Sequence, residues 1–143
     1  MGTRFSEIHH MAISRFNDYS FLKLPEKDRE SLLDRYLMSA DRDVQSICNI
    51  TLPKDEYTRQ YDEDLSEVLK EVLACGEAYY WILPKLYNTR LLRNGISTKD
   101  VSVFSPANLL KEISALKDFL YEDFRRKMID YSYDIVDVSQ LKA

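Results

Sequence analysis

The stretch FSPANLLKEISALKDFLYEDFRRKMIDYSY, residues 104–133, contains the start signal and the apolar stripe of one long helix. Ser105 can cap this helix with its hydroxyl, and Pro106 falls at the first helical position, where its missing N–H costs nothing. Apolar residues then recur every three or four positions and so share one face: Leu109, Ile113, Leu116, Leu120, Phe124, Met128 and Tyr131. A helix of about 26 residues spans roughly 39 Å, more than the core of one small domain requires, so we expect it to reach a partner.

The first half of the chain predicts two helices joined by an aromatic-rich connection at residues 17–24. Residues 5–16 have the spacing of a short amphipathic helix. Residues 25–48 predict a longer helix, because a proline followed by acidic residues suits the positive end of a helix dipole. The helical pattern stops after residue 48, and Pro53 lies in a polar segment, so residues 49–61 are predicted to be a surface loop.

A third helix is predicted after this loop. Asp62 or Asp64 can cap it, and eleven apolar positions between residues 65 and 87 keep the same helical periodicity. Pro84 removes one backbone N–H and clashes with the preceding turn, so we expect a kink or a break there. The pair Asn94-Gly95 is a strong helix stop.

The remaining segments are predicted to be extended. Residues 96–104 alternate apolar and polar positions between the two long helices. Residues 134–143 carry a β-branched run that is typical of an edge strand, which we interpret as a docking tail. The expected interface residues are Tyr131, Tyr133, Ile135, Val136, Val138 and Leu141. The fold class is therefore all-α, a single domain over residues 1–143 with about four helices, two of them long.

Composition limits the classes of function. The net charge is −4 with acids spread along the chain, whereas coating nucleic acid needs clustered Lys and Arg. Three scattered glycines cannot build a Gly-rich phosphate loop, and no apolar run approaches the roughly 20 residues that cross a bilayer. Ten tyrosines and one tryptophan favour a binding surface, because tyrosine is large, amphipathic and enriched at interfaces.

Few residues are candidates for chemistry. Cys48 and Cys75 lie on apolar stripes and are interpreted as buried free thiols. His9 and His10 are adjacent, so on a helix they point about 100° apart and cannot clamp one metal ion together. Glu77 lies in an aromatic run, where we expect a buried carboxyl bonded to a tyrosine or an arginine, with a functional carboxylate as the alternative. No catalytic residue, metal or cofactor is predicted.

Three segments together resemble a family of virion proteins. They are FSEIHHMAISRFNDYSFLKL at residues 5–24, WILPKLYNTRLLRN at residues 81–94, and STKDVSVFSPANLLKEISALKDFLYEDFRRKMIDYSY at residues 97–133. Most of the chain, including the order of its elements, resembles head-to-tail connector (neck adaptor) proteins of tailed bacteriophages. The matching motifs are helix caps and packing positions, with Pro84, Ser105 and Pro106 as the fold-determining residues.

The resemblance implies a non-enzymatic subunit of the virion neck that assembles in the host cytoplasm. It implies a ring, twelvefold to match a portal, that binds the portal protein and other neck or tail proteins through residues 135–141. DNA would pass through the lumen without sequence-specific binding. Two other hypotheses stay open: a small acidic binding or inhibitor protein, and a small helical ribonuclease-like enzyme. The enzyme is the weaker of the two, because this sequence lacks the Arg and His motif that such nucleases usually carry on one helix.

Overall fold

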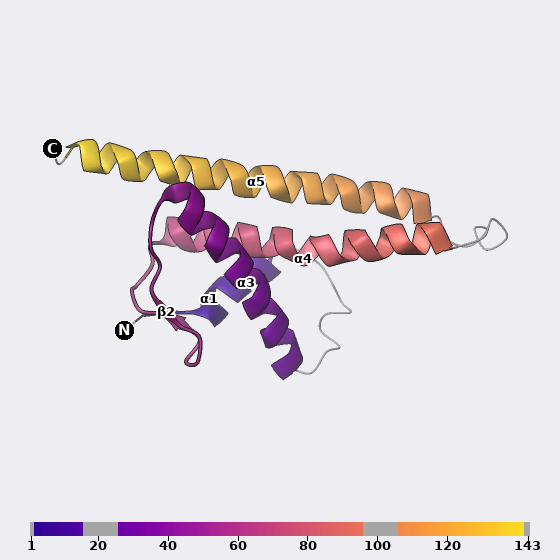
Figure 1. Cartoon of the computed structure of the whole chain (residues 1–143), viewed down its shortest axis with the longest axis horizontal. Helices are drawn as coiled ribbons and strands as arrows, with labels where there is room; N and C mark the ends of the chain where they lie inside the picture. The colour runs from indigo at the N-terminus through magenta and orange to yellow at the C-terminus, as the bar shows by residue number, and fades with distance from the viewer. Residues whose placement is uncertain (1, 16–25, 96–105, 142–143) are drawn as a thin grey trace.

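A computed structural model describes residues 2–15, 26–95 and 106–141, and within them the chain forms four helices and three two-residue strands (Figure 1). The helices are α1 (Phe5–Ile13), α3 (Glu26–Cys48), α4 (Glu67–Gly95) and α5 (Pro106–Leu141). The strands are β1 (Thr3–Arg4), β2 (Lys54–Asp55) and β3 (Gln60–Tyr61). The predicted all-α bundle with two long helices is confirmed. Within these ranges no helix is both long and apolar enough to cross a membrane.

The two long helices α4 and α5 lie antiparallel and form a hairpin that the other elements cover in part (Figure 1). Helix α3 crosses this hairpin and contacts both of its helices, and α1 packs on α4. The end of the hairpin nearest Gly95 and Pro106 extends beyond α1 and α3 (Figure 1). One apolar core joins all four helices, and its most buried members include Ile8, Leu37, Val44, Leu73, Ala78 and Phe124.

Gly76 allows α3 and α5 to approach α4 closely. A Cβ atom at this position would lie 2.6 Å from the Cβ of Ala40 on α3 and 2.6 Å from two ring atoms of Phe124 on α5. Both distances are far below van der Waals contact, so only a glycine fits between the two neighbours. The helix crossing therefore depends on a residue that is a poor helix former.

A small antiparallel sheet, in the order β1-β3-β2, was not predicted. Thr3 pairs with Tyr61, and Lys54 pairs with Tyr61 on the other side, so the chain start is held against the hairpin made by residues 54–61. Strands β2 and β3 lie in the segment 49–61 that was predicted to be a loop, and β1 precedes the first predicted helix. Two-residue strands are too short to produce an alternating sequence pattern, which explains why the sequence does not reveal them.

The ends of two helices are fixed by local hydrogen bonds. Helix α3 stops at Asn49, which adopts a left-handed φ of 54°, while the N–H of Ile50 donates to the carbonyl of Gln45 at 3.2 Å. This pattern is a Schellman motif. Helix α4 begins after Ser66, whose Oγ accepts the N–H of Leu69 at 3.2 Å, so the predicted cap at Asp62 or Asp64 is wrong.

Pro84 does not break α4, which runs as one helix from Glu67 to Gly95. The proline is solvent-exposed, and α4 packs along α5 for much of its length. Tertiary packing of a helix outweighs the local cost of one missing hydrogen bond. Of the two alternatives predicted at Pro84, a kink or a break, the break is therefore wrong, whereas the predicted stop at Gly95 agrees with the end of the helix.

The predicted extended tail is also wrong, because residues 134–141 continue α5 as a helix. No glycine or proline follows Pro106 within α5, so nothing in the backbone stops helix propagation. Local β propensity is a weak preference that helical context overrides. Ser105, the connection 17–24 and the link 96–104 lie outside the described residues.

The predicted core stripe of α5 is correct at every described position except Leu116. Leu120, Phe124 and Met128 are buried, and Ile113 and Tyr131 pack against the core. Leu116 is 36% exposed, in contrast to its predicted core position. The closest core contacts of α5 are made by Leu120, Phe124 and Met128, which are nearly inaccessible.

Alanine substitutions at a buried and at an exposed position of α5 test which of its side chains contribute to the core. We expect Phe124→Ala to lower the free energy of unfolding by about 3–5 kcal/mol, because it opens a cavity between three helices. Leu116→Ala should cost less than about 1 kcal/mol, as substitutions at exposed positions do. Urea unfolding followed by circular dichroism compares the two, and equal losses would contradict the assigned helix phase.

The close approach of the helices at Gly76 predicts that replacing this glycine by alanine lowers stability, which is the opposite of the usual effect inside a helix. Replacing a glycine by alanine inside a helix stabilises it by roughly 1 kcal/mol on propensity alone. Here we expect Gly76→Ala to be destabilising, because its methyl group overlaps Ala40 and Phe124. A melting temperature that stays equal or rises would show that the helices can separate without loss.

Candidate functional site

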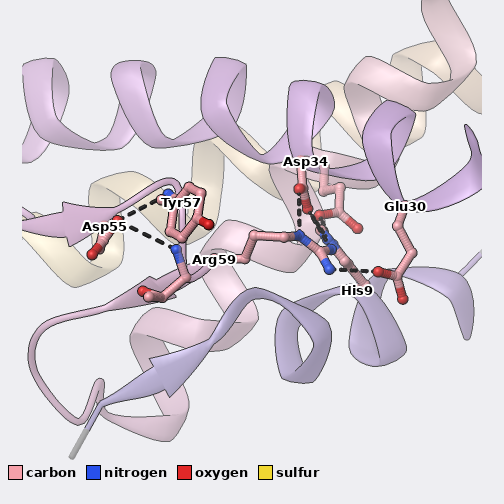
Figure 2. Close-up of polar contacts among 8 residues, drawn as sticks. His9, Glu30, Asp34, Asp55, Tyr57 and Arg59 are labelled. Carbon is pink, nitrogen blue, oxygen red and sulfur yellow. Dashed lines mark hydrogen bonds and ion pairs between the residues drawn. The ribbon is translucent and has the colours of Figure 1, made fainter. Parts of the chain in front are cut away.

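A histidine of α1 is buried between carboxylates of two other helices. The Nδ1 atom of His9 lies 2.7 Å from Oε1 of Glu77 on α4, and its Nε2 atom lies 2.7 Å from Oδ1 of Asp34 on α3. His9 and Glu77 are both buried, whereas Asp34 is partly exposed. Helices α1, α3 and α4 therefore meet at the side chain of His9. Figure 2 shows this side chain together with Asp34. The sequence predicted a tyrosine or an arginine as the hydrogen-bond partner of Glu77. This prediction is wrong, because the partner is His9.

Both ring nitrogens of His9 face carboxylate oxygens, so each contact requires a proton. Burial alone lowers the pKa of His9, but the hydrogen bonds to Asp34 and Glu77 outweigh it and raise the pKa to about 9. Burial opposes ionisation of Asp34, yet hydrogen bonds from His9 and Arg59 outweigh it and lower the pKa of that carboxyl. Burial raises the pKa of Glu77, whose second oxygen, Oε2, has no hydrogen-bond partner. A doubly protonated His9 therefore joins the helices at neutral pH.

Arg59 extends this cluster to the surface. Its guanidinium donates to both oxygens of Asp34, from Nε at 2.7 Å and from Nη2 at 2.9 Å, and Nη1 donates to Glu30 (Figure 2). Arg59 has a φ of 58°, a left-handed conformation that is uncommon for a residue with a side chain. The side chain of Asp55 holds the turn by accepting the N–H groups of Tyr57 and Thr58. We call His9, Glu30, Asp34, Arg59 and Glu77 the buried charge network.

The geometry of the buried charge network is that of a structural clamp. A general base must reach the proton it abstracts, but His9 is nearly inaccessible and both of its nitrogens are engaged. A shallow cavity of about 270 Å³ lies beside Asp34 and Phe5, and His9 is not among the residues that line it. The network therefore stabilises the junction of α1, α3, α4 and the β-hairpin.

A second feature is a groove of about 400 Å³ where α3, α4 and α5 meet. Its apolar lining includes Ile47, Tyr79, Tyr80, Tyr121, Phe124 and Met128. The aromatic rings pack against each other: the centroid of Tyr79 lies 5.1 Å from that of Tyr80 and 5.2 Å from that of Tyr121. This volume and lining are typical of a binding pocket. We call it the aromatic groove.

Charged groups surround the aromatic groove. Asp43 lines it and accepts a hydrogen bond from the hydroxyl of Tyr80. Burial raises the pKa of Tyr80, and Asp43 raises it further, while the charge of Arg42 lowers it. Arg125 also lines the groove and is half exposed, with a long 4.0 Å contact to Glu122. The lining of the aromatic groove therefore carries one acidic side chain, Asp43, and one basic side chain, Arg125, beside the aromatic rings.

The predicted interface residues do not form the groove. Tyr133 is exposed, Tyr131 packs partly against the core, and Ile135 is half-buried, all on α5. For Val136, Val138 and Leu141 only the helical backbone is described. Other large apolar side chains are more exposed than expected, notably Tyr87 and Phe119. Phe119 could have been found from sequence, because it falls out of phase with the apolar stripe of its helix.

The remaining candidate residues have structural surroundings. Cys48 and Cys75 are buried free thiols, as predicted, and burial raises the pKa of Cys75 to about 11. The Nζ atom of Lys127 lies 3.1 Å from a carboxylate oxygen of Glu71 and 3.4 Å from one of Asp123, so Lys127 belongs to an ion-pair network. Within the described part of the chain, no group of three or more His, Cys, Asp or Glu residues is placed to hold a metal ion.

Comparisons of the chain with protein-family models, with curated proteins and with solved structures find no match.

The protonation of His9 predicts how stability depends on pH. The pKa of His9 is raised from its ordinary value of 6.5 to about 9 in the folded state. Protonated His9 therefore stabilises the folded state fully below pH 6.5, and this contribution is lost as the pH rises toward about 9. At about 1.4 kcal/mol per pKa unit, the loss approaches about 3 kcal/mol. We expect the free energy of unfolding to fall between about pH 6.5 and pH 8.5 in urea titrations.

Two variants isolate this effect. His9→Gln should be less stable at the lower pH and should flatten the dependence, whereas His10→Gln, at an exposed neighbouring position, should leave it unchanged. An NMR titration of the two imidazoles in the wild-type chain reads the pKa values directly. A pKa of His9 at or below its ordinary value would contradict the protonation assigned to it.

Proposed function

We propose that this chain is a non-catalytic assembly protein that binds protein partners through the exposed faces of the α4–α5 hairpin. The observation that carries the proposal is the exposure of large apolar side chains on the hairpin, with Tyr87 on α4 and Phe119 on α5 each more than half exposed. Large apolar side chains that are exposed on a folded chain are candidates for contact with a protein partner.

The shape of the hairpin supports this role. The end near Gly95 and Pro106 extends beyond α1 and α3, so α4 and α5 present faces there that those two helices do not cover (Figure 1). A 36-residue α5 is about 54 Å long at 1.5 Å per residue. An extended pair of helices with apolar side chains on its outside is suited to contacts between subunits.

The resemblance to neck adaptors of tailed bacteriophages makes the proposal specific. We propose that the chain forms a ring between portal and tail in the virion neck, twelvefold to match the portal, after assembly in the host cytoplasm. DNA would pass through the lumen without sequence-specific contacts. A net charge of −4 suits such a passage, because like charges repel the phosphates of DNA.

An acidic binding or inhibitor protein is the second candidate. The aromatic groove favours it, since a pocket of about 400 Å³ lined by three tyrosines can accept a side chain of an unrelated partner. Such a protein would bind its target as a monomer or a dimer. Oligomeric state therefore separates the two candidates.

Native mass spectrometry and light scattering test the proposal, on the chain alone from low to high concentration and after mixing with portal protein. We expect weak self-association alone and a defined multi-subunit ring with portal, because a template raises the effective stability of the assembly. A strict monomer under both conditions would exclude the ring. Binding of one copy per unrelated partner would favour the inhibitor.

A further inference from the structure

We propose that β1 and α1 separate from the other helices as one unit when the proton between His9 and Glu77 is lost. We call these residues, 3–13, the amino-terminal latch. The inference is independent of the proposed assembly. It rests on the geometry around the imidazole ring of His9 and on the small number of buried contacts that hold α1.

Both contacts of the His9 ring need a hydrogen atom, because a carboxylate accepts hydrogen bonds and does not donate them. Nε2 lies 2.7 Å from Oδ1 of Asp34, and Nδ1 lies 2.7 Å from Oε1 of Glu77. With one proton fewer, a ring nitrogen and the carboxylate oxygen opposite it both present lone pairs at this distance. That contact then becomes repulsive, whichever of His9 and Glu77 carried the proton before.

The charged groups that face His9 come from each element packed against α1. Glu77 belongs to α4 and Asp34 to α3, and Arg59 of the β-hairpin reaches His9 only through Asp34 (Figure 2). Among the residues that the structure describes, His9 is the only cation within ion-pair distance of Glu77. Glu77 is fully buried, so an unpaired charge there is costly until α1 separates from α4 and water reaches it.

The other polar contacts of the latch are weak anchors. Two of them are single hydrogen bonds between neutral groups, and the third is an ion pair whose acidic side chain is half exposed, which contributes little stability. They join Phe5 to the carbonyl of Arg59, Thr3 to the N–H of Leu65, and Glu7 to Lys70. The only other large contribution comes from the apolar side chains of α1 that are buried: Phe5, Ile8 and Ala12.

A pivot for the latch lies directly behind it. Arg15 pairs with Glu71 of α4 at 3.1 Å and with Asp123 of α5 at 3.2 Å, so the chain stays attached there when α1 moves. The opposite end of α1 borders the shallow cavity of about 270 Å³, which Phe5 lines together with Asp34 of α3. The latch can therefore open along this cavity and turn about Arg15.

The remaining helices keep a core of their own without the latch. Helix α3 packs on both α4 and α5, and Gly76 brings Ala40 and Phe124 together where they cross. A terminal segment with few buried contacts opens at a lower free energy than the core on which it packs. Opening of the latch is therefore local and leaves the α3–α4–α5 body folded.

Hydrogen exchange with mass spectrometry on the full chain tests the latch. Peptides covering residues 3–13 report its opening, peptides from the middle of α4 and α5 report global unfolding, and the intrinsic pH dependence of exchange is divided out of both. We expect the latch peptides to exchange at least about tenfold faster than the others, at about pH 6 and at about pH 8.5.

The opening equilibrium of the latch should also rise by more than about tenfold between these two pH values. The reason is that the pKa of His9 is about 9 while the latch is closed and returns to its ordinary value of 6.5 when the latch opens, so the closed form loses its advantage as the pH rises. Asp34 stays ionised over this range, because its pKa is lowered.

Glu77→Gln distinguishes a latch from a purely structural cluster. The amide has the shape of the carboxyl and can donate a hydrogen bond to Nδ1 of a neutral His9, so the contact no longer needs the titrating proton. Opening should then change by less than about threefold between the two pH values. Asp34→Asn, at a partly exposed carboxyl, should flatten the dependence for the same reason at Nε2. Glu67→Gln, at an exposed position of α4, is the control and should behave as wild type.

Circular dichroism melts verify that each variant folds, and Asp34→Asn provides the test if the buried substitution at Glu77 does not. Latch peptides that exchange no faster than those of α4 and α5 would overturn the proposal, because residues 3–13 would then open only by global unfolding. Wild-type opening that is independent of pH would overturn it too. The same holds for a pH dependence that persists in every folded variant at Glu77 and Asp34.

Discussion

Burial of His9 between Glu77 and Asp34 is the interaction on which the amino-terminal half of the molecule depends. Each nitrogen of the ring is 2.7 Å from a carboxylate oxygen, and removing His9 would leave the buried carboxyl of Glu77 without this partner. Arg59 continues the same network and holds the β-hairpin to α3. Helix α1, which is only nine residues long, is too short to be stable alone and is retained by these contacts and by its apolar face.

The helices of this protein could be predicted from its sequence, and the contacts between them could not. Periodic apolar residues and terminal signals such as Pro106 and Gly95 identify the helices, because both are local properties of the chain. The buried charge network joins residues up to 68 positions apart, and no local pattern marks His9 as the partner of Glu77. The extended tail was predicted from local β propensity, which α5 overrides by continuing to Leu141.

The candidate binding surface could likewise be predicted only in part from the sequence. The excess of tyrosine pointed to binding, and several of these residues do line the aromatic groove. Their assignment to one face required the packing of three helices, since Ile47, Tyr79 and Tyr121 come from different elements. The apolar stripe of a helix identifies the side chains that are buried against a neighbouring helix. A residue outside the stripe, such as Phe119, can be assigned to a binding surface only when the folded surface is known.

The pairing of β1 with β3 has a consequence for synthesis of the chain on the ribosome. Several contacts that hold β1 and α1 are made with residues that are translated later: Tyr61 pairs with Thr3, the carbonyl of Arg59 accepts the N–H of Phe5, and Glu77 binds His9. The apolar face of α1 therefore stays without α4, the helix on which it packs, until α4 has left the exit tunnel. Helix α1 is made before α4 encloses it, and during that interval its apolar face is open to a chaperone or to the wrong partner.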